Sequence, residues 1–267
     1  MKIQRLKGQS AIITGSSSGI GEAIAIELAV EGAKVVINYS HSEKAAFDIV
    51  RGIKKNGGEA IAIKADVSNE NDVKDMFKEA ISTFGTIDIL VNNAGIQKDA
   101  SITEMSLNDW KLVLDINLTG QFLCSREAIK EYRRRGLTET SCALGKIICM
   151  SSVHEIIPWS GHVNYSSSKG GVSMFMKSMA QEVGRDKIRV NAIAPGAIKT
   201  RINKEIWATK EAEQKVLELI PYNRLGEAKD VAKVAAWLAS DESDYIHGTT
   251  IFVDGGMALY PGFVDNG

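Results

Sequence analysis

The sequence has few cysteines. Cys124, Cys142 and Cys149 make an odd number, and no two of them form a CxxC pair. Neither a disulfide framework nor a cysteine metal site is therefore predicted, and we expect no bound metal. Cys149 lies in an apolar run, which favours a place in the core.

Long apolar runs are also absent. None approaches the roughly 18 residues that a membrane span requires, so no membrane partner is predicted. The amino-terminal stretch MKIQRLKGQSAIITG lacks the apolar core of a signal peptide. Together with the cysteine pattern, these absences lead us to expect a cytoplasmic protein.

An excess of charge of one sign is lacking too. The 32 Lys and Arg residues nearly balance 33 Asp and Glu residues, so no basic field favours nucleic acid. The composition, with 44% hydrophobic and 24% charged residues, is typical of a soluble globular protein. A chain of 267 residues has room for one large α/β domain.

Short apolar runs alternate with amphipathic stretches along the chain. Strands are predicted at 11–14, 34–38, 60–64, 87–92, 146–150, 189–194 and 250–253, and helices at 19–31, 43–55, 70–84, 107–134, 164–183 and 229–240. Nearly continuous hydrophobicity suits parallel strands covered on both faces. The alternation predicts an α/β fold, a Rossmann-like doubly wound parallel sheet of seven strands with helices on both faces.

We expect one domain over residues 1–267, in which residues 1–100 mainly bind a dinucleotide and residues 110–222 carry the catalytic and substrate elements. Residues 138–144 are polar and are predicted to form a loop. Residues 200–222 interrupt the alternation before the last strand. Because ligands of open α/β sheets bind at the carboxyl ends of the strands, this insertion is a candidate lid or substrate-specificity element.

A glycine-rich turn follows the first predicted strand, with the sequence Thr14-Gly15-Ser16-Ser17-Ser18-Gly19-Ile20-Gly21. Glycines permit a tight turn and let backbone N–H groups approach a pyrophosphate, and the following helix N-terminus favours its charge. The context of strand, glycines and helix is the one that dinucleotide binding requires.

The ends of the next three strands carry polar or small side chains. Asn38, Tyr39 and Ser40 are neutral where strict NAD binders place an acid, so a 2′-phosphate would meet no repulsion. A polar turn indifferent to the phosphate is the equally weighted alternative. Asp66 either accepts from an adenine amino group or is an N-cap or surface residue. In the sequence Asn92-Asn93-Ala94-Gly95, an Asn side chain can lock loops by bonding main chain.

The stretch Tyr165-Ser-Ser-Ser-Lys169 places a phenol and an ammonium four residues apart on a predicted helix, hence on one face. A nearby cation is expected to lower the pKa of the phenol from its usual value of about 10 towards working pH. Tyr165 is therefore a candidate general acid or base.

Two further polar residues are candidates for the same site. Asn117 lies inside a predicted helix, which is unfavourable for Asn and hints at a local kink, a polar task or a surface position. A hydroxyl follows the fifth strand at both Ser151 and Ser152, and the sequence pattern alone does not choose between them.

In this order and spacing, TGSSSGIG, Asp66-Val67, NNAG, Asn117, Ser152, YSSSK and PGAIKT resemble the short-chain dehydrogenase/reductase family over essentially the whole chain. The resemblance implies hydride transfer between a CH–OH group and NAD or NADP, with dual use expected. It selects Ser152 over Ser151 and implies a catalytic tetrad of Asn117, Ser152, Tyr165 and Lys169. The cofactor residues that it implies are Thr14, Gly15, Ser17, Ser18, Gly19, Ile20, Gly21, Tyr39, Ser40, Asp66, Val67, Asn93, Ala94, Gly95, Tyr165, Lys169, Pro195, Gly196, Ile198 and Thr200.

Within that family, the segments MSSVHEIIPW, AAWLAS and DGGMALYPGF are similar to bacterial glucose 1-dehydrogenases. The sequence departs from that subgroup at Gln97, where Glu is expected, and at Ser40, where Arg is expected. The expected substrate is an aldose oxidised to its lactone, and the substrate residues are Gln97, Ser152, His154, Tyr165 and Asn203. Glu155 is a further candidate, and Trp159 either stacks on a sugar or lies in the core.

Two other functions stand beside the sugar dehydrogenase. A 3-oxoacyl or general ketone reductase uses the same scaffold, and a non-catalytic nucleotide sensor is a distant alternative because Tyr165 and Lys169 are both present. A homotetramer is expected, since the predicted helix at 164–183 is apolar on more than one side and family members commonly pair it and the preceding long helix, predicted at 107–134, across a twofold axis. The C-terminal MALYPGFVDNG is expected to pack on a neighbouring subunit.

Overall fold

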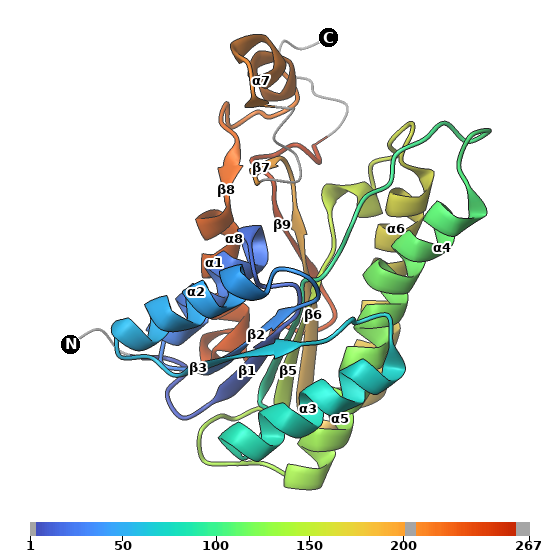
Figure 1. Ribbon diagram of the computed structural model, residues 1–267. Coiled ribbons are helices and arrows are strands. Elements are labelled where there is room, and N and C mark those ends of the chain that lie inside the picture. Colours follow the sequence, from blue (N-terminus) through green and yellow to red (C-terminus); the bar gives the residue numbers. More distant parts are fainter. Residues whose placement is uncertain (1–3, 201–206, 260–267) are drawn as a thin grey trace.

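A computed structural model describes residues 4–200 and 207–259 of the chain. Seven parallel strands form one sheet in the order β3-β2-β1-β4-β5-β6-β9 (Figure 1). The strands are β1 (Ser10–Ile13), β2 (Lys34–Tyr39), β3 (Ala60–Lys64), β4 (Ile89–Asn92), β5 (Gly145–Met150), β6 (Ile188–Pro195) and β9 (Thr250–Val253). This arrangement confirms the predicted doubly wound sheet.

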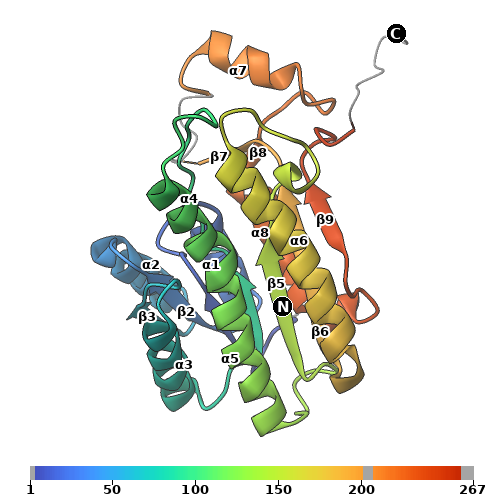
Figure 2. The same cartoon turned by 90° about the vertical axis from the view of Figure 1, so that its right-hand side faces the viewer.

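Helices cover both faces of the sheet (Figures 1 and 2). One core layer joins the sheet to α1 (Gly19–Val30), α2 (Glu43–Lys55) and α8 (Ala228–Ala239). The other joins it to α3 (Glu70–Phe84), α5 (Gly120–Arg135) and α6 (Val163–Val183). Cys149 is fully buried in this second layer, as its apolar surroundings predicted.

Local sequence explains where several helices begin and end. The Asn69 side chain accepts hydrogen bonds from the N–H groups of Asn71 and Asp72 at the start of α3, and Gly85 ends that helix at a φ of 87°. Ser106 accepts from the N–H of Asp109 and begins α4 (Leu107–Leu114). Such caps satisfy backbone groups that a helix end leaves unpaired.

The helix predicted at 107–134 is not continuous. Between α4 and α5 lies a π-helical turn, η1 (Asp115–Thr119), with Asn117 at its centre. A π turn inserts an extra residue into a helix and is common at functional sites. The kink that Asn117 suggested is therefore present, and the surface position that was its alternative is excluded because Asn117 is fully buried.

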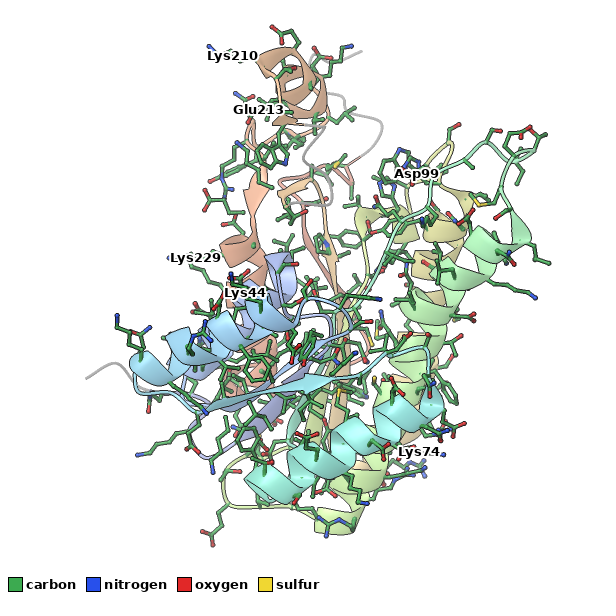
Figure 3. All side chains as sticks on the ribbon, viewed as in Figure 1. Lys44, Lys74, Asp99, Lys210, Glu213 and Lys229 are labelled. Atoms are coloured by element: carbon green, nitrogen blue, oxygen red, sulfur yellow. The ribbon has the colours of Figure 1, made fainter. Side chains whose placement is uncertain are left out.

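The segment between β6 and β9 contains elements that the hydrophobic pattern missed. Two short strands, β7 (Ile198–Lys199) and β8 (Gly226–Glu227), pair in parallel beside the main sheet. Helix α7 (Lys210–Leu217) stands beyond them at the end of the molecule where the strands finish (Figure 1). Lys199 joins β7 to α7 through an ion pair of 2.8 Å with Glu213, which Figure 3 labels.

The opposite end of the sheet holds a buried cation. The Lys146 ammonium, at the start of β5, donates to Gln9 Oε1 and Ser141 Oγ and lies 3.5 Å from an Asp241 carboxylate oxygen. These contacts anchor the loop at 138–144, which the sequence predicted as a loop.

Membrane-spanning helices are not found in residues 4–200 and 207–259, where every helix is too short or too polar for a bilayer.

Candidate active site at the carboxyl ends of the strands

The glycine-rich turn after β1 is fastened to the loop after β4. Thr14 Oγ1 accepts hydrogen bonds from the N–H groups of Asn93 (2.9 Å) and Ala94 (3.0 Å). The Asn93 amide in turn donates to the carbonyls of Thr14 (2.9 Å) and Gly15 (3.1 Å). The predicted use of an Asn to lock loops is thus present in this structure.

Close approach explains the glycines of this turn. Gly15 and Gly19 have φ values of 59° and 63°, a region that favours glycine. A Cβ on Gly21 would lie 2.4 Å from Asn93 Nδ2. Thr200 Cγ2 would lie 3.8 Å from a Cβ on Gly19, so the segment after β7 faces the glycine turn. This bare backbone at the start of α1 fits a dinucleotide phosphate.

Asn38 has a structural task that sequence reasoning missed. It is buried, and its Oδ1 accepts from the N–H of Gly15 at 2.9 Å. Its Nδ2 donates to the carbonyls of Ala65 (3.1 Å) and Ile63 (3.4 Å). One side chain therefore ties the end of β2 to the turn after β1 and to the end of β3. A signal was present, since Asn is unusual in an apolar strand.

The end of β2 is less neutral than its sequence implied. Tyr39 is buried with its ring edge against Phe47, and burial together with the nearby Glu43 carboxylate raises the pKa of the phenol. Ser40 is half-buried. Glu43, at the start of α2, thus brings a negative charge to the strand end where a 2′-phosphate would approach.

Asp66 and Val67, in the segment after β3, make different contacts. Asp66 is exposed, as the surface alternative required, and its Oδ1 accepts from the N–H and hydroxyl of Ser68 at 2.9 and 2.7 Å. Val67 is buried, and a Cβ on Gly120 would lie 2.8 Å from its Cγ2. Val67 therefore packs against the start of α5.

Asn117 connects the loop after β4 with α6. Its Oδ1 accepts from the N–H of Ile96 (2.8 Å), and its Nδ2 donates to the Ile96 carbonyl (3.0 Å) and to Ser168 Oγ (3.1 Å). Gly95 lies against the same side chain, with 3.3 Å between its ideal Cβ position and Asn117 Oδ1. In the π turn this amide is buried, and its partner Ser168 is the residue that precedes Lys169 on α6.

Lys169 is buried, and its ammonium donates to the Met150 carbonyl at 2.9 Å. Burial lowers the pKa of Lys169 to about 8 because desolvation penalises its charged form. The neighbouring Ser151 hydroxyl donates to the Lys169 carbonyl at 3.5 Å.

The sequence-based expectation for the Tyr165 pKa is wrong for the protein alone. Burial raises the pKa of the phenol, while hydrogen bonds with the Ser152 and Gln97 side chains oppose that rise. The Lys169 ammonium lies 5.4 Å from the centroid of the Tyr165 ring. Desolvation outweighs the two hydrogen bonds, so the phenol is the neutral form at pH 7.

Ser152 and Gln97 both meet the Tyr165 phenol. Ser152 is buried, and its Oγ also accepts from the N–H of His154 at 3.2 Å. The segment that carries Gln97 is held by Asn164, whose amide donates to the Lys98 carbonyl at 2.9 Å, and by a hydrogen bond from Ala100 N–H to the Gly161 carbonyl.

Stacked rings stand beside Tyr165. Trp159 lies between His154, at 4.2 Å between centroids, and His162, at 3.5 Å. Trp159 is 37% exposed, which excludes the core position that was one of its two alternatives. The His162 ring is 3.2 Å from an oxygen of Asp99, a residue labelled in Figure 3.

His154 is held as a hydrogen-bond acceptor. Its Nδ1 lies 3.0 Å from the Ile157 carbonyl, which can only accept, so the proton is assigned to Nδ1. Burial lowers the pKa of His154, which keeps the ring neutral and leaves Nε2 as an acceptor.

The remaining predicted residues are distributed around this group. Pro195 ends β6, and a Cβ on Gly196 would lie 2.8 Å from Asp254 Cβ. Ile198 is buried in β7. Asn203 lies outside the described residues.

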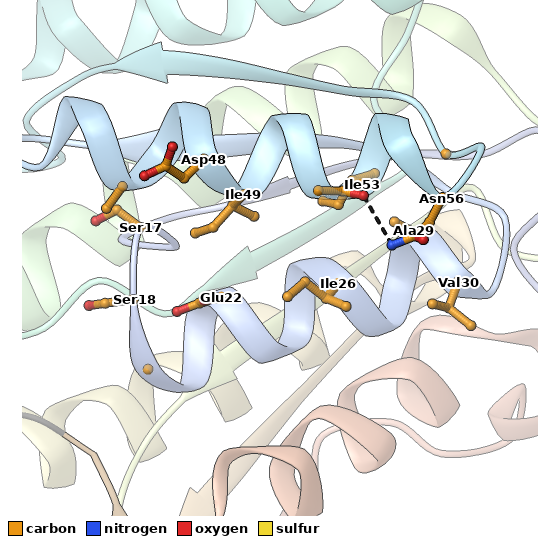
Figure 4. A pocket seen from close by; sticks show the side chains of 14 residues that line it. Ser17, Ser18, Glu22, Ile26, Ala29, Val30, Asp48, Ile49, Ile53 and Asn56 are labelled. Atoms are coloured by element: carbon orange, nitrogen blue, oxygen red, sulfur yellow. Dashed lines mark hydrogen bonds between the residues drawn. The ribbon is translucent and has the colours of Figure 1, made fainter.

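A groove of about 450 Å³ lies between α1 and α2 (Figure 4). Ser17, Ser18 and Gly19 line one end, and apolar side chains such as Ile26 and Ile53 continue it. None of the four predicted tetrad residues lines this groove. Among residues 4–200 and 207–259, no group of three or more His, Cys, Asp or Glu side chains is placed to hold a metal ion.

Known proteins resemble this chain along nearly all of its length. A family model described as enoyl-(acyl carrier protein) reductase matches residues 15–258. The 3beta-hydroxysteroid dehydrogenase 1 of Eggerthella lenta is 48% identical over 97% of each chain. Glucose 1-dehydrogenase 2 of Bacillus subtilis is 43% identical over 96% of this chain and 97% of its own.

Solved structures agree with these sequence relatives. A gluconate 5-dehydrogenase from Burkholderia cenocepacia, in complex with NADP and tartrate, is 34% identical with a TM-score of 0.88. The match covers 96% of this chain and 97% of that one.

The fit of the glycine turn is testable by substitution. Gly21→Ala places a methyl group 2.4 Å from Asn93 Nδ2 and should disrupt the loops, weakening NADH or NADPH binding at least about tenfold, or 1.4 kcal/mol. Fluorescence titration measures this. Gly52→Ala is the control, because no atom lies within 4 Å of its Cβ position. Equal binding by the two variants would contradict the assignment.

Proposed function

The chain belongs to the short-chain dehydrogenase/reductase family and is an NAD(P)-dependent oxidoreductase acting on CH–OH groups, and we propose that its substrate is a free aldose such as glucose, oxidised at the anomeric carbon. The observation that carries this proposal is the set of groups around the Tyr165 phenol. Gln97 both donates and accepts and hydrogen-bonds with the phenol, and His154 Nε2 is left as an acceptor beside the Tyr165 ring.

Such a set suits a ring with several hydroxyl groups. A site whose polar groups are built to pair with substrate hydroxyls rejects analogues that leave those groups unpaired. Similarity to glucose 1-dehydrogenase 2 supports the same substrate class.

The proposed proton chemistry uses four side chains. Tyr165 takes the proton of the substrate hydroxyl, Ser152 orients that oxygen, and Lys169 stabilises the phenolate that must form. Asn117 holds the loop after β4 against α6 and keeps a polar path open beside Lys169. A bound nicotinamide supplies the acceptor for the hydride. Because the pKa of Tyr165 is raised in the protein alone, the phenol is expected to become a base only when a cofactor cation and substrate complete the site.

A hydroxysteroid is the second candidate substrate, on the basis of the 48% identity to a 3beta-hydroxysteroid dehydrogenase. Ile156 is 59% exposed and adjoins the stacked rings in sequence, which would suit an apolar ring system. Ketone or 3-oxoacyl reduction is the third, since a 3-oxoacyl-[acyl-carrier-protein] reductase of Synechocystis is 41% identical over 96% of this chain.

Self-association into a homotetramer is part of the proposal. Leu112 on α4, Phe122 on α5 and Met174 on α6 are 41%, 44% and 63% exposed. These three apolar side chains lie on the helices that were expected to meet across a twofold axis. The expected contact of residues 260–267 lies outside the described residues.

The substrate assay compares glucose, galactose, xylose, a 3β-hydroxysteroid and an acetoacetyl ester, each with both cofactors. We expect oxidation of at least one aldose, and glucose is the expected best. Absorbance of the reduced nicotinamide measures turnover. Turnover of the steroid or the ester with no aldose oxidised above background would replace the aldose by that substrate class.

Removal of one hydroxyl tests the proposed base. In Tyr165→Phe the ring remains but the proton acceptor is lost, so kcat should fall at least about 10²-fold with cofactor affinity nearly unchanged. Tyr245→Phe is the control, since Tyr245 is fully exposed. Tyr165→Phe turnover close to that of the control would refute the mechanism.

Cofactor preference tests the end of β2. We expect use of both NAD and NADP with a preference below about tenfold, or 1.4 kcal/mol. Ser40→Arg should move the preference towards NADP by adding a phosphate partner, and Glu43→Gln should do so by removing a repelling carboxylate. The ratio of kcat/KM values measures this. Exclusive use of NAD by the unmodified enzyme, by more than about a hundredfold, would contradict dual use.

A further inference from the structure

Glu155 was a candidate for contacting a sugar, but its carboxylate is engaged elsewhere. Glu155 is the last residue of the short helix η2 (Val153–Glu155), directly after His154, which is one of the stacked rings. Its Oε1 accepts a hydrogen bond from Ser173 Oγ of α6 at 3.2 Å. Its Oε2 is buried and accepts no hydrogen bond from the described residues. A carboxylate in this position is tied to α6 by a single hydroxyl and acts mainly through its charge.

The position of Ser173 brings this charge near Lys169. Ser173 follows Lys169 by four residues on α6, so the two side chains lie on one face, with about 5–6 Å between their Cβ atoms. Lys169 is only 4% exposed, and the hydrogen bond that the structure records for its ammonium goes to the Met150 carbonyl. An ammonium desolvated to this degree is costly unless an opposite charge compensates it.

Few charged groups face Lys169 from the elements packed around it. From β5 comes Cys149, but burial raises the pKa of that thiol to about 12, so it stays neutral while Lys169 titrates. From α6 comes the Tyr165 phenol, and from η1 the uncharged Asn117 amide. The Glu155 carboxylate opposes the desolvation that lowers the pKa of Lys169 to about 8. It is thus the negative charge, among the described residues, that favours the ammonium.

We propose that Glu155 is a positioning residue whose carboxylate, held by Ser173, keeps Lys169 in its charged form beside the Tyr165 phenol. This inference rests on the proposed roles of Tyr165 and Lys169, and it does not depend on which alcohol is the substrate. Without the carboxylate, Lys169 releases its proton at a lower pH. Tyr165 then loses the cation that stabilises its phenolate over the same range of pH.

Titration of Lys169 tests the proposal without substrate or cofactor. Protein labelled with ¹³C at lysine Cε is titrated by NMR, and the Lys169 signal is the one missing in Lys169→Arg. The wild-type midpoint is expected near the pKa of about 8. In Glu155→Gln, which keeps the shape and the Ser173 bond, proton binding should weaken at least about threefold, or half a pH unit.

Matched variants separate charge from structure. Glu155→Asp restores the charge and should return the midpoint towards wild type, and Ser173→Ala should give a smaller shift because the carboxylate remains. Glu182→Gln removes an exposed carboxylate from the same helix and should leave the midpoint unchanged. Lys146, whose pKa burial also lowers to about 8, lies at the opposite end of β5 and is an internal reference.

Activity adds a second readout once an alcohol and ketone pair is known from the substrate assay. In the reduction direction, the alkaline limb of kcat against pH should move to lower pH in Glu155→Gln and return in Glu155→Asp. A Lys169 midpoint that is equal in Glu155→Gln and wild type would overturn the proposal, as would equal shifts of Lys169 and Lys146. If no aldose is oxidised but the midpoint shifts, the aldose proposal fails and this one stands.

Discussion

The hydrogen bonds that two asparagine side chains make to main chain hold together the loops at the carboxyl ends of β1 to β4, where the glycine-rich turn lies. Asn93 joins the loop after β4 to the turn after β1, and Asn38 joins that turn to the ends of β2 and β3. Both amides act where backbone groups would otherwise be left unpaired, which is costly in a buried setting. The close approach of backbone that glycines permit at Gly15 and Gly21 depends on these contacts.

A similar arrangement connects the loop after β4 to α6. The π turn at η1 directs Asn117 inward, where its amide bonds the backbone of Ile96 and the Ser168 hydroxyl. One π turn therefore positions the loop after β4 relative to the helix that carries Tyr165 and Lys169. A π turn is a less favourable form of helix, and the hydrogen bonds of Asn117 with Ile96 and Ser168 compensate for this cost.

Desolvation acts in opposite directions on the two key titratable groups. Burial raises the pKa of Tyr165 and lowers that of Lys169, so in the protein alone both are driven towards their neutral forms. The proposed catalysis by this pair requires the reverse, a phenolate beside an ammonium. Nearby groups must therefore supply charge compensation, which is why the fixed carboxylate of Glu155 and the hydroxyl of Ser152 matter beyond their direct contacts.

Much of this architecture followed from the sequence by itself. Period and composition identified the seven strands and most helices, and the order of TGSSSGIG, NNAG and YSSSK identified the family, because these patterns are local. Contacts between distant segments were decided only by the tertiary structure. The pattern missed β7, β8 and α7, treated Asn38 as a neutral strand end, and assigned Tyr165 a lowered pKa. The pairing of β7 with β8, the hydrogen bonds of Asn38 and the raised pKa of Tyr165 depend on burial or on partners far away in the chain, and neither desolvation nor a long-range hydrogen bond can be read from local residue order.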